Sequence, residues 1–117
     1  MLHHVSIEVE PGDVERAVEF WELLGFRRIE APDELGGYVT GLEHAGTQIH
    51  LIHAEGATVP PLGHPAVVVE DFEATFAALD TAGFAPEHHR ELWGKPRAFA
   101  TMPGGHKVEL MAAPPSA

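Results

Sequence analysis

The sequence predicts an α+β fold of two tandem βαβββ modules, whose curled mixed sheets form a metal-binding cup. The first observation is an internal repeat, and the second is that each copy has one helical pattern between stretches of strand-like alternation. Three pairs of segments match in the same order, at shifts of 60, 58 and 59 positions: 4–10 with 64–70, 24–26 with 82–84, and 48–52 with 107–111. A duplicated unit explains this order and spacing.

The length fits one domain that contains both modules. A chain of 117 residues is long enough for one real core and too short for two independent ones. We expect the first module at about 1–55, a linker with Pro60-Pro61 at 54–63, and the second module at about 64–112, followed by a frayed tail at 113–117.

Each module is expected to begin with a strand rich in β-branched residues and to continue into a helix. Asp13 and Asp71 are suited to cap the starts of the two helices, and Gly25 and Gly83 to end them. Three further strands follow in each module: 26–30, 37–42 and 48–53, then 85–91, 97–102 and 107–112. Segments 44–47 and 103–106 are expected to be hairpin loops.

Strand alternation directs a set of potential metal ligands to one face. In the first and last strand of each module, alternate residues are apolar and are expected to pack on the helix. The opposite face then receives His4, His50, His64 and Glu109, which occupy equivalent positions of the repeat. Three imidazoles and a carboxylate suit a divalent ion of zinc, iron, nickel, cobalt or manganese. We therefore expect a metal site on this face.

Charge and composition exclude several classes of protein. The net charge of −11 disfavours binding to nucleic acid or to an anionic membrane surface. No apolar stretch approaches a membrane span, and the N-terminal residues do not resemble a signal peptide. Cysteine is absent, so any metal must be bound by histidine and carboxylate. These features favour a cytoplasmic protein that acts on a small molecule.

At these positions the sequence resembles the vicinal oxygen chelate superfamily, which includes glyoxalase I, methylmalonyl-CoA epimerase, extradiol dioxygenases and bleomycin-resistance proteins. The resemblance runs from residue 3 to about 112. It is carried by His4-Val-Ser-Ile-Glu-Val9, by 17–26, by Gly63-His64 and by 103–110. It implies that His4, His64 and Glu109 are metal ligands, and that the chain forms homodimers, in which some relatives build each site from two subunits.

The resemblance also shows where this chain departs from glyoxalase I. His50 occupies the place of a fourth ligand that is usually Glu in glyoxalase I and Gln in the epimerases. Glu8 stands where short glyoxalases often have an arginine for glutathione, which argues against that substrate. The segment Met102-Pro-Gly-Gly105 replaces an acidic turn without loss of a ligand. Proton transfer is then expected to fall to Glu109, to His50 or to metal hydroxide.

The first interpretation of function is a lyase or isomerase of glyoxalase or epimerase type, which chelates a substrate through neighbouring oxygens and stabilises an enediolate. The second is an Fe²⁺ extradiol-type dioxygenase, and the third a non-enzymatic drug- or metabolite-binding protein. Side chains that are candidates for lining the cup are Tyr38, Trp93, Arg97 and Phe99.

Two further histidine-containing segments are expected to be structural. His3 precedes the first ligand and is expected to face the helix side. The run 87–91 contains two histidines but is expected to be a solvated strand at a sheet edge, where neighbouring side chains point in opposite directions.

Overall fold

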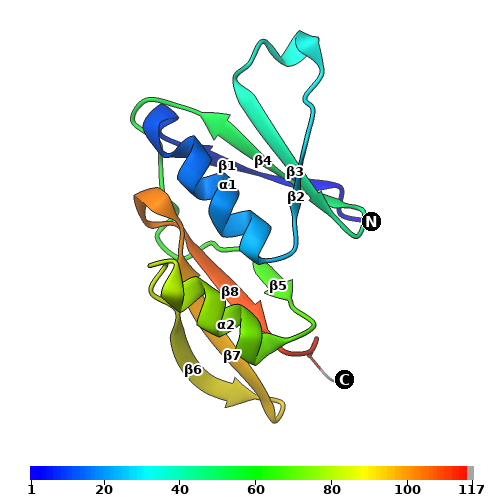
Figure 1. Cartoon of the computed structure of the whole chain (residues 1–117), viewed down its shortest axis with the longest axis vertical. Helices are drawn as coiled ribbons and strands as arrows, with labels where there is room; N and C mark the ends of the chain where they lie inside the picture. Colours follow the sequence, from blue (N-terminus) through cyan, green and yellow to red (C-terminus); the bar gives the residue numbers. More distant parts are fainter. Residues whose placement is uncertain (116–117) are drawn as a thin grey trace. The chain divides into compact units, whose positions relative to one another are not determined.

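The computed structural model describes residues 1–115, so the end of the expected tail, 116–117, lies outside the described residues. The chain divides into two compact units, one at Met1–Val59 and one that starts at Pro60. Each unit contains a four-stranded mixed sheet and one α-helix (Figure 1). The expected α+β fold of two βαβββ modules is confirmed, with two open sheets. No helix within residues 1–115 is long and apolar enough to cross a membrane.

The first unit has one helix on one face of a mixed sheet. The strand order is β1-β4-β3-β2, in which β1 and β4 are parallel and the other pairs are antiparallel. The elements are β1 (His4–Val9), η1 (Pro11–Asp13), α1 (Val14–Leu23), β2 (Arg27–Ile29), η2 (Asp33–Leu35), β3 (Val39–His44) and β4 (Thr47–His53).

The second unit repeats this topology. Its strand order is β5-β8-β7-β6, and again the first strand of the unit lies at the sheet edge and pairs in parallel with the last, while the other pairs are antiparallel. The elements are β5 (Ala66–Val68), α2 (Phe72–Thr81), β6 (Glu87–Leu92), β7 (Lys95–Thr101), η3 (Pro103–Gly105) and β8 (Lys107–Met111). The internal repeat of the sequence is therefore a repeat of structure.

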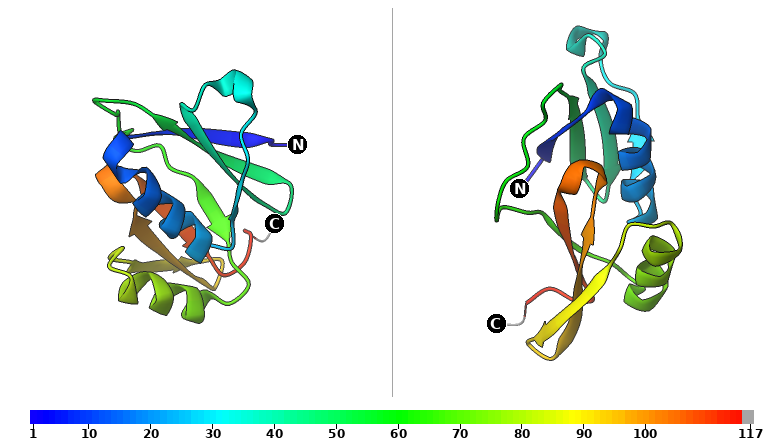
Figure 2. Two further views of the ribbon diagram at one scale, coloured as in Figure 1. Left: turned by 45° about the horizontal axis from the view of Figure 1, so that its top comes forward. Right: turned by 90° about the vertical axis from the view of Figure 1, so that its left-hand side faces the viewer.

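The core of each unit lies between its helix and one face of its sheet, as the edge-on view of Figure 2 shows. In the first unit Trp21 of α1 and Leu51 of β4 are both fully buried. In the second, Leu79 of α2 and Leu110 of β8 are fully buried. Burial of such side chains is the main stabilising term of each layer, and it leaves the other face of each sheet free for polar residues.

Most strand boundaries differ from expectation by one to two residues, and two of the differences have a clear local cause. Strand β5 begins at Ala66 rather than at His64, because Pro65 has no amide hydrogen and joins the ladder only through its carbonyl, which accepts from Glu109 N at 3.0 Å. The first hairpin loop is shorter than 44–47. Ala45 and Gly46 both have positive φ, 50° and 85°, which closes a two-residue turn directly after β3.

The helix ends agree in part with expectation. Asp71 caps α2, since its side chain accepts from Ala74 N at 3.1 Å. Asp13 precedes α1 but makes no side-chain cap hydrogen bond, because it is the last residue of η1. Gly25 and Gly83 follow the helices with φ of 94° and 86°, a conformation that favours glycine and that confirms the expected helix ends.

Candidate functional site

In the first unit, His4 and His50 lie on the sheet face opposite α1. Within the parallel β1–β4 pair, His4 is paired with Gln48 and Ser6 with His50. The two imidazole rings stack with centroids 4.0 Å apart and an interplanar angle of 13°. Two histidines from neighbouring strands therefore present adjacent nitrogen atoms on one surface.

The orientation expected for His3 is wrong. Its Nδ1 lies 2.9 Å from Nδ1 of His4, and its ring centroid lies 6.4 Å from that of His50. His3 precedes the first residue of β1, so strand alternation does not direct its side chain. Since one Nδ1 must donate and the other accept, this contact also influences which nitrogen of His4 carries a proton.

Gln48 orients His50, a role that strand alternation alone did not reveal. The Nε2 of His50 lies 2.8 Å from Oε1 of Gln48. An amide oxygen only accepts, so Nε2 donates and the lone pair of neutral His50 is on Nδ1. Burial, and then the charges of His4 and His3, lower the pKa of His50 below its usual value. Neutral imidazole is the form that binds metal ions.

In the second unit, His64 lies within hydrogen-bond distance of Glu109. His64 lies just before β5 rather than within it, and its Nδ1 donates to the carbonyl of Leu62 at 2.9 Å. In neutral His64 the Nε2 lone pair then points toward Oε1 of Glu109, 3.2 Å away. Two acceptors in this position are satisfied by a proton or by a metal ion between them. Glu109 itself is 8% exposed.

Arg97 and Phe99, two of the candidate lining residues, lie next to this pair. Phe99 is directly opposite Glu109 in the β7–β8 ladder, and its ring lies 4.9 Å from that of His64. Nε of Arg97 donates to Oε2 of Glu109 at 2.9 Å. His89 of β6 also lies on this face, with its ring 4.6 Å from that of Phe99. The position of His89 beside Phe99 follows from the pairing of β6 with β7 and was not predicted from the sequence.

The other candidate lining residues lie elsewhere in the fold. Tyr38 precedes β3 and is 70% exposed. Trp93 has a φ of 46° and, with Gly94, forms the turn between β6 and β7, away from the strand positions that carry Glu109. The alternation expected for 87–91 is confirmed, because His88 points to the helix side, where it stacks on Phe76 at 4.0 Å.

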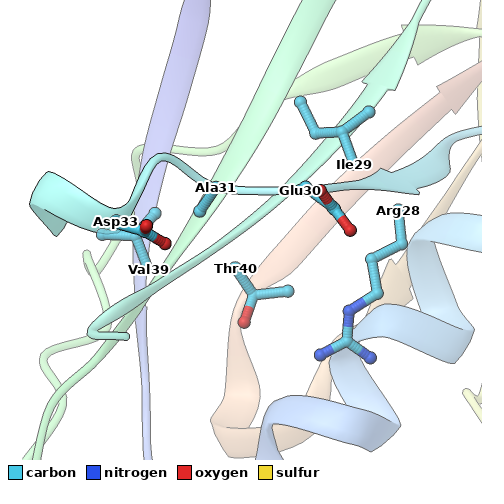
Figure 3. A pocket seen from close by; sticks show the side chains of 7 residues that line it. All are labelled: Arg28, Ile29, Glu30, Ala31, Asp33, Val39 and Thr40. Atoms are coloured by element: carbon cyan, nitrogen blue, oxygen red, sulfur yellow. The ribbon is translucent and has the colours of Figure 1, made fainter. Parts of the chain in front are cut away.

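A separate pocket of about 570 Å³ lies at the β2–β3 edge of the first unit (Figure 3). Its wall combines apolar side chains with Arg28, Glu30 and Asp33. Two of its polar groups already have partners, since Arg28 binds Glu15 at 2.9 Å and Thr40 contacts His53 at 2.8 Å. Arg28 and Thr40 are therefore engaged within the protein.

The candidate ligands form two pairs, one in each unit. Among residues 1–115, no single group of three or more His, Cys, Asp or Glu side chains could hold a metal ion. Each unit instead supplies two donors: His4 and His50 in the first, His64 and Glu109 in the second. Imidazole nitrogen and carboxylate oxygen fit zinc and its first-row neighbours, so the donor chemistry suits such an ion.

Comparison with known proteins identifies related families and folds. The family model described as Glyoxalase/Bleomycin resistance protein/Dioxygenase superfamily matches residues 2–110. Comparison with curated proteins finds no match.

Several solved structures have the same fold. A glyoxalase family protein from Bacillus anthracis is 22% identical, with a TM-score of 0.84 over 95% of this chain and 93% of that one. One from Enterococcus faecalis is 24% identical, with a TM-score of 0.72 over 95% and 96%. A protein named oxidase ChaP-H2 is 20% identical, with a TM-score of 0.76 over 100% and 96%. At these identities the likeness establishes the fold.

The lowered pKa of His50 can be tested by NMR titration of metal-free protein. We expect a midpoint below the usual value of about 6.5. In His4→Gln the midpoint should rise, yet stay below that value because burial remains. Since the folded-state pKa is the lower one, the contribution of His50 to stability is constant above about pH 6.5 and falls as the pH drops toward the folded-state pKa. A wild-type midpoint at or above 6.5 would contradict this account.

Proposed function

Since the chain belongs to the Glyoxalase/Bleomycin resistance protein/Dioxygenase superfamily, we propose that it is a metal-dependent lyase or isomerase. Its substrate is a small molecule that binds through two neighbouring oxygen atoms. The observation that carries the proposal is the His64–Glu109 pair, whose acceptor atoms face each other at 3.2 Å while Leu62 holds the other ring nitrogen. That arrangement leaves a place for a cation.

The proposed metal ligands are His4, His50, His64 and Glu109. The equivalence of the two pairs in the internal repeat supports this set, because His4 and His64 precede or begin the first strand of each unit, and His50 and Glu109 lie on the last. Neighbouring polar groups also make hydrogen bonds to three of the proposed ligands and so orient them. Gln48 contacts His50, Leu62 contacts His64 and Arg97 contacts Glu109, as is usual for metal-binding side chains.

A divalent metal bound there would supply a Lewis acid that stabilises negative charge on the substrate oxygens. The chain itself must then move a proton at the carbon next to the carbonyl group. Glu109 and His50 are the proposed proton carriers. Neutral His50 has one lone pair, on Nδ1, so it would accept a proton only while that nitrogen is not bound to the metal. Phe99, next to His64 and Glu109, and the more distant Tyr38 and Trp93 are proposed to contact the substrate.

A dioxygenase is the second candidate, because a two-histidine, one-carboxylate set also suits Fe²⁺ chemistry with O₂. The fourth ligand, His50, disfavours it, since O₂ and substrate both need open positions on the metal. A binding protein without catalysis is the third candidate, and two complete ligand pairs argue against it.

Metal analysis tests the ligand set. Protein prepared without a metal-affinity tag and then reconstituted should hold about one equivalent of metal per chain, whereas His64→Ala and Glu109→Ala should each fall below about a tenth. His88→Ala is the matched control, because His88 stacks on Phe76 on the helix side, and it should keep its metal. Full occupancy in both ligand variants would place the site elsewhere.

Subunit mixing tests whether the two pairs of one site come from two chains. His4→Ala and Glu109→Ala each damage a different pair. If sites are shared across a homodimer, random exchange of the two variants gives mixed dimers with one intact site, so that about a quarter of wild-type metal binding returns. If the mixture binds no more metal than the separate variants, or if the protein is a monomer, the pairs are not shared.

Isotope exchange tests the reaction type. With 2-hydroxy ketones in deuterated water, the metal-loaded protein should incorporate deuterium next to the carbonyl, and Glu109→Gln should slow this at least about a hundredfold. A catechol with Fe²⁺-loaded protein should cause no oxygen uptake. Oxygen uptake would favour the dioxygenase, and the absence of both reactions with any substrate tried would favour the binding protein.

A further inference from the structure

Glu109 is bound on its second oxygen by Arg97, an arginine that is largely shielded from solvent. The Arg97 and Glu109 side chains are only 14% and 11% exposed, and Nε of Arg97 donates to Oε2 at 2.9 Å. The contact is diagonal across the β7–β8 ladder, in which Arg97 is paired with Met111 and Phe99 with Glu109. A carboxylate this far from water is costly unless an opposite charge and hydrogen bonds accompany it. Arg97 supplies both.

The guanidinium group of Arg97 is itself held in place. Its Nη1 donates to the backbone carbonyl of Arg90 at 3.3 Å, and its central carbon lies 5.4 Å from the centroid of the Phe99 ring. Contacts with a carboxylate, a backbone carbonyl and an aromatic face restrict a planar group in different directions. The position of Oε2 is therefore restricted as well, and Oε1 is the oxygen that remains turned toward His64.

We propose that Arg97 is a positioning residue that reserves Oε2 and confines Glu109 to binding a metal through Oε1 alone. The inference rests on the metal site proposed above. A carboxylate can bind an ion through one oxygen or through both, and each bound oxygen takes a coordination position. In an octahedral site four protein ligand atoms leave two positions, and a fifth leaves one. Arg97 thus keeps room for a substrate that binds through two oxygens.

This role differs from direct substrate contact by Arg97. The guanidinium already uses Nε for Glu109 and Nη1 for Arg90, so its main contacts are within the protein. Removal of Arg97 would free Oε2 to join the ion, and a chelating ligand would then compete for a single position. A ligand that needs only one position would be affected much less.

The test uses Co²⁺-loaded protein and two added ligands of the same charge. One binds the metal through two oxygen atoms, and the other binds it through a single atom. Acetohydroxamate and azide both bind as monoanions, so the ratio of their affinities removes the effect of the lost positive charge. In Arg97→Met this ratio should fall by about tenfold or more, because a chelating ligand then finds one open position instead of two. Arg97→Lys, which keeps a donor for Oε2, should restore the wild-type ratio to within about threefold.

Lys107→Met is the matched control. Lys107 is a cation of β8, two positions from Glu109, and it contacts Thr101 rather than the carboxylate. Its affinity ratio should equal that of wild type. If Arg97→Met does not fold, Arg97→Gln takes its place with the same expectation.

The outcomes separate the two proposals. A wild-type protein that binds no Co²⁺ overturns the metal site, and the role of Arg97 with it. A wild-type protein that binds Co²⁺, together with an unchanged ratio in the Arg97 variant, overturns the role of Arg97 alone.

Discussion

The parallel pairing of the first and last strands of each unit is the constraint on which the candidate site depends. In β1–β4 the register aligns Ser6 with His50, and in β5–β8 it aligns Ala66 with Glu109. Alternation then buries Leu51 and Leu110 against the helices and leaves the candidate ligands on the other face. A shift of one residue in the register of either pair would turn the apolar side chains of one strand to the outer face. It would also turn the polar side chains of that strand toward the helix and bury them. Core and site are thus specified together.

Much of this could be predicted from the sequence because repeat and alternation are local patterns. The repeat located both units, and alternation placed His4, His50 and Glu109 on the face opposite the helices. Both patterns end where the ladder ends. His64 lies outside β5 and takes its orientation from the carbonyl of Leu62, and His3 lies outside β1. Neither side chain could be oriented by counting along a strand.

The contacts that residues on neighbouring strands make around the candidate ligands could not be predicted from the sequence either. Arg97 was a candidate for substrate contact, but its bond to Glu109 depends on the register of β7 against β8. His89 reaches Phe99 through the register of β6 against β7. Trp93 was a candidate for lining the cup, but it forms a two-residue turn with Gly94 and lies outside the ladder. Pairwise register, unlike alternation, requires the positions of two strands at once.

The ion pair between Arg97 and Glu109 also bears on when an ion would enter the protein. A zinc finger folds only with its metal, because its ligands have no other partners. Here Glu109 has its counter-charge, His64 has a carbonyl acceptor and His50 has an amide. If the proposed site binds an ion, such a chain would fold before loading and would exchange the ion without unfolding. The element that it carries would then be decided by the supply of free ions around the finished protein, and a change of growth medium would be enough to change it.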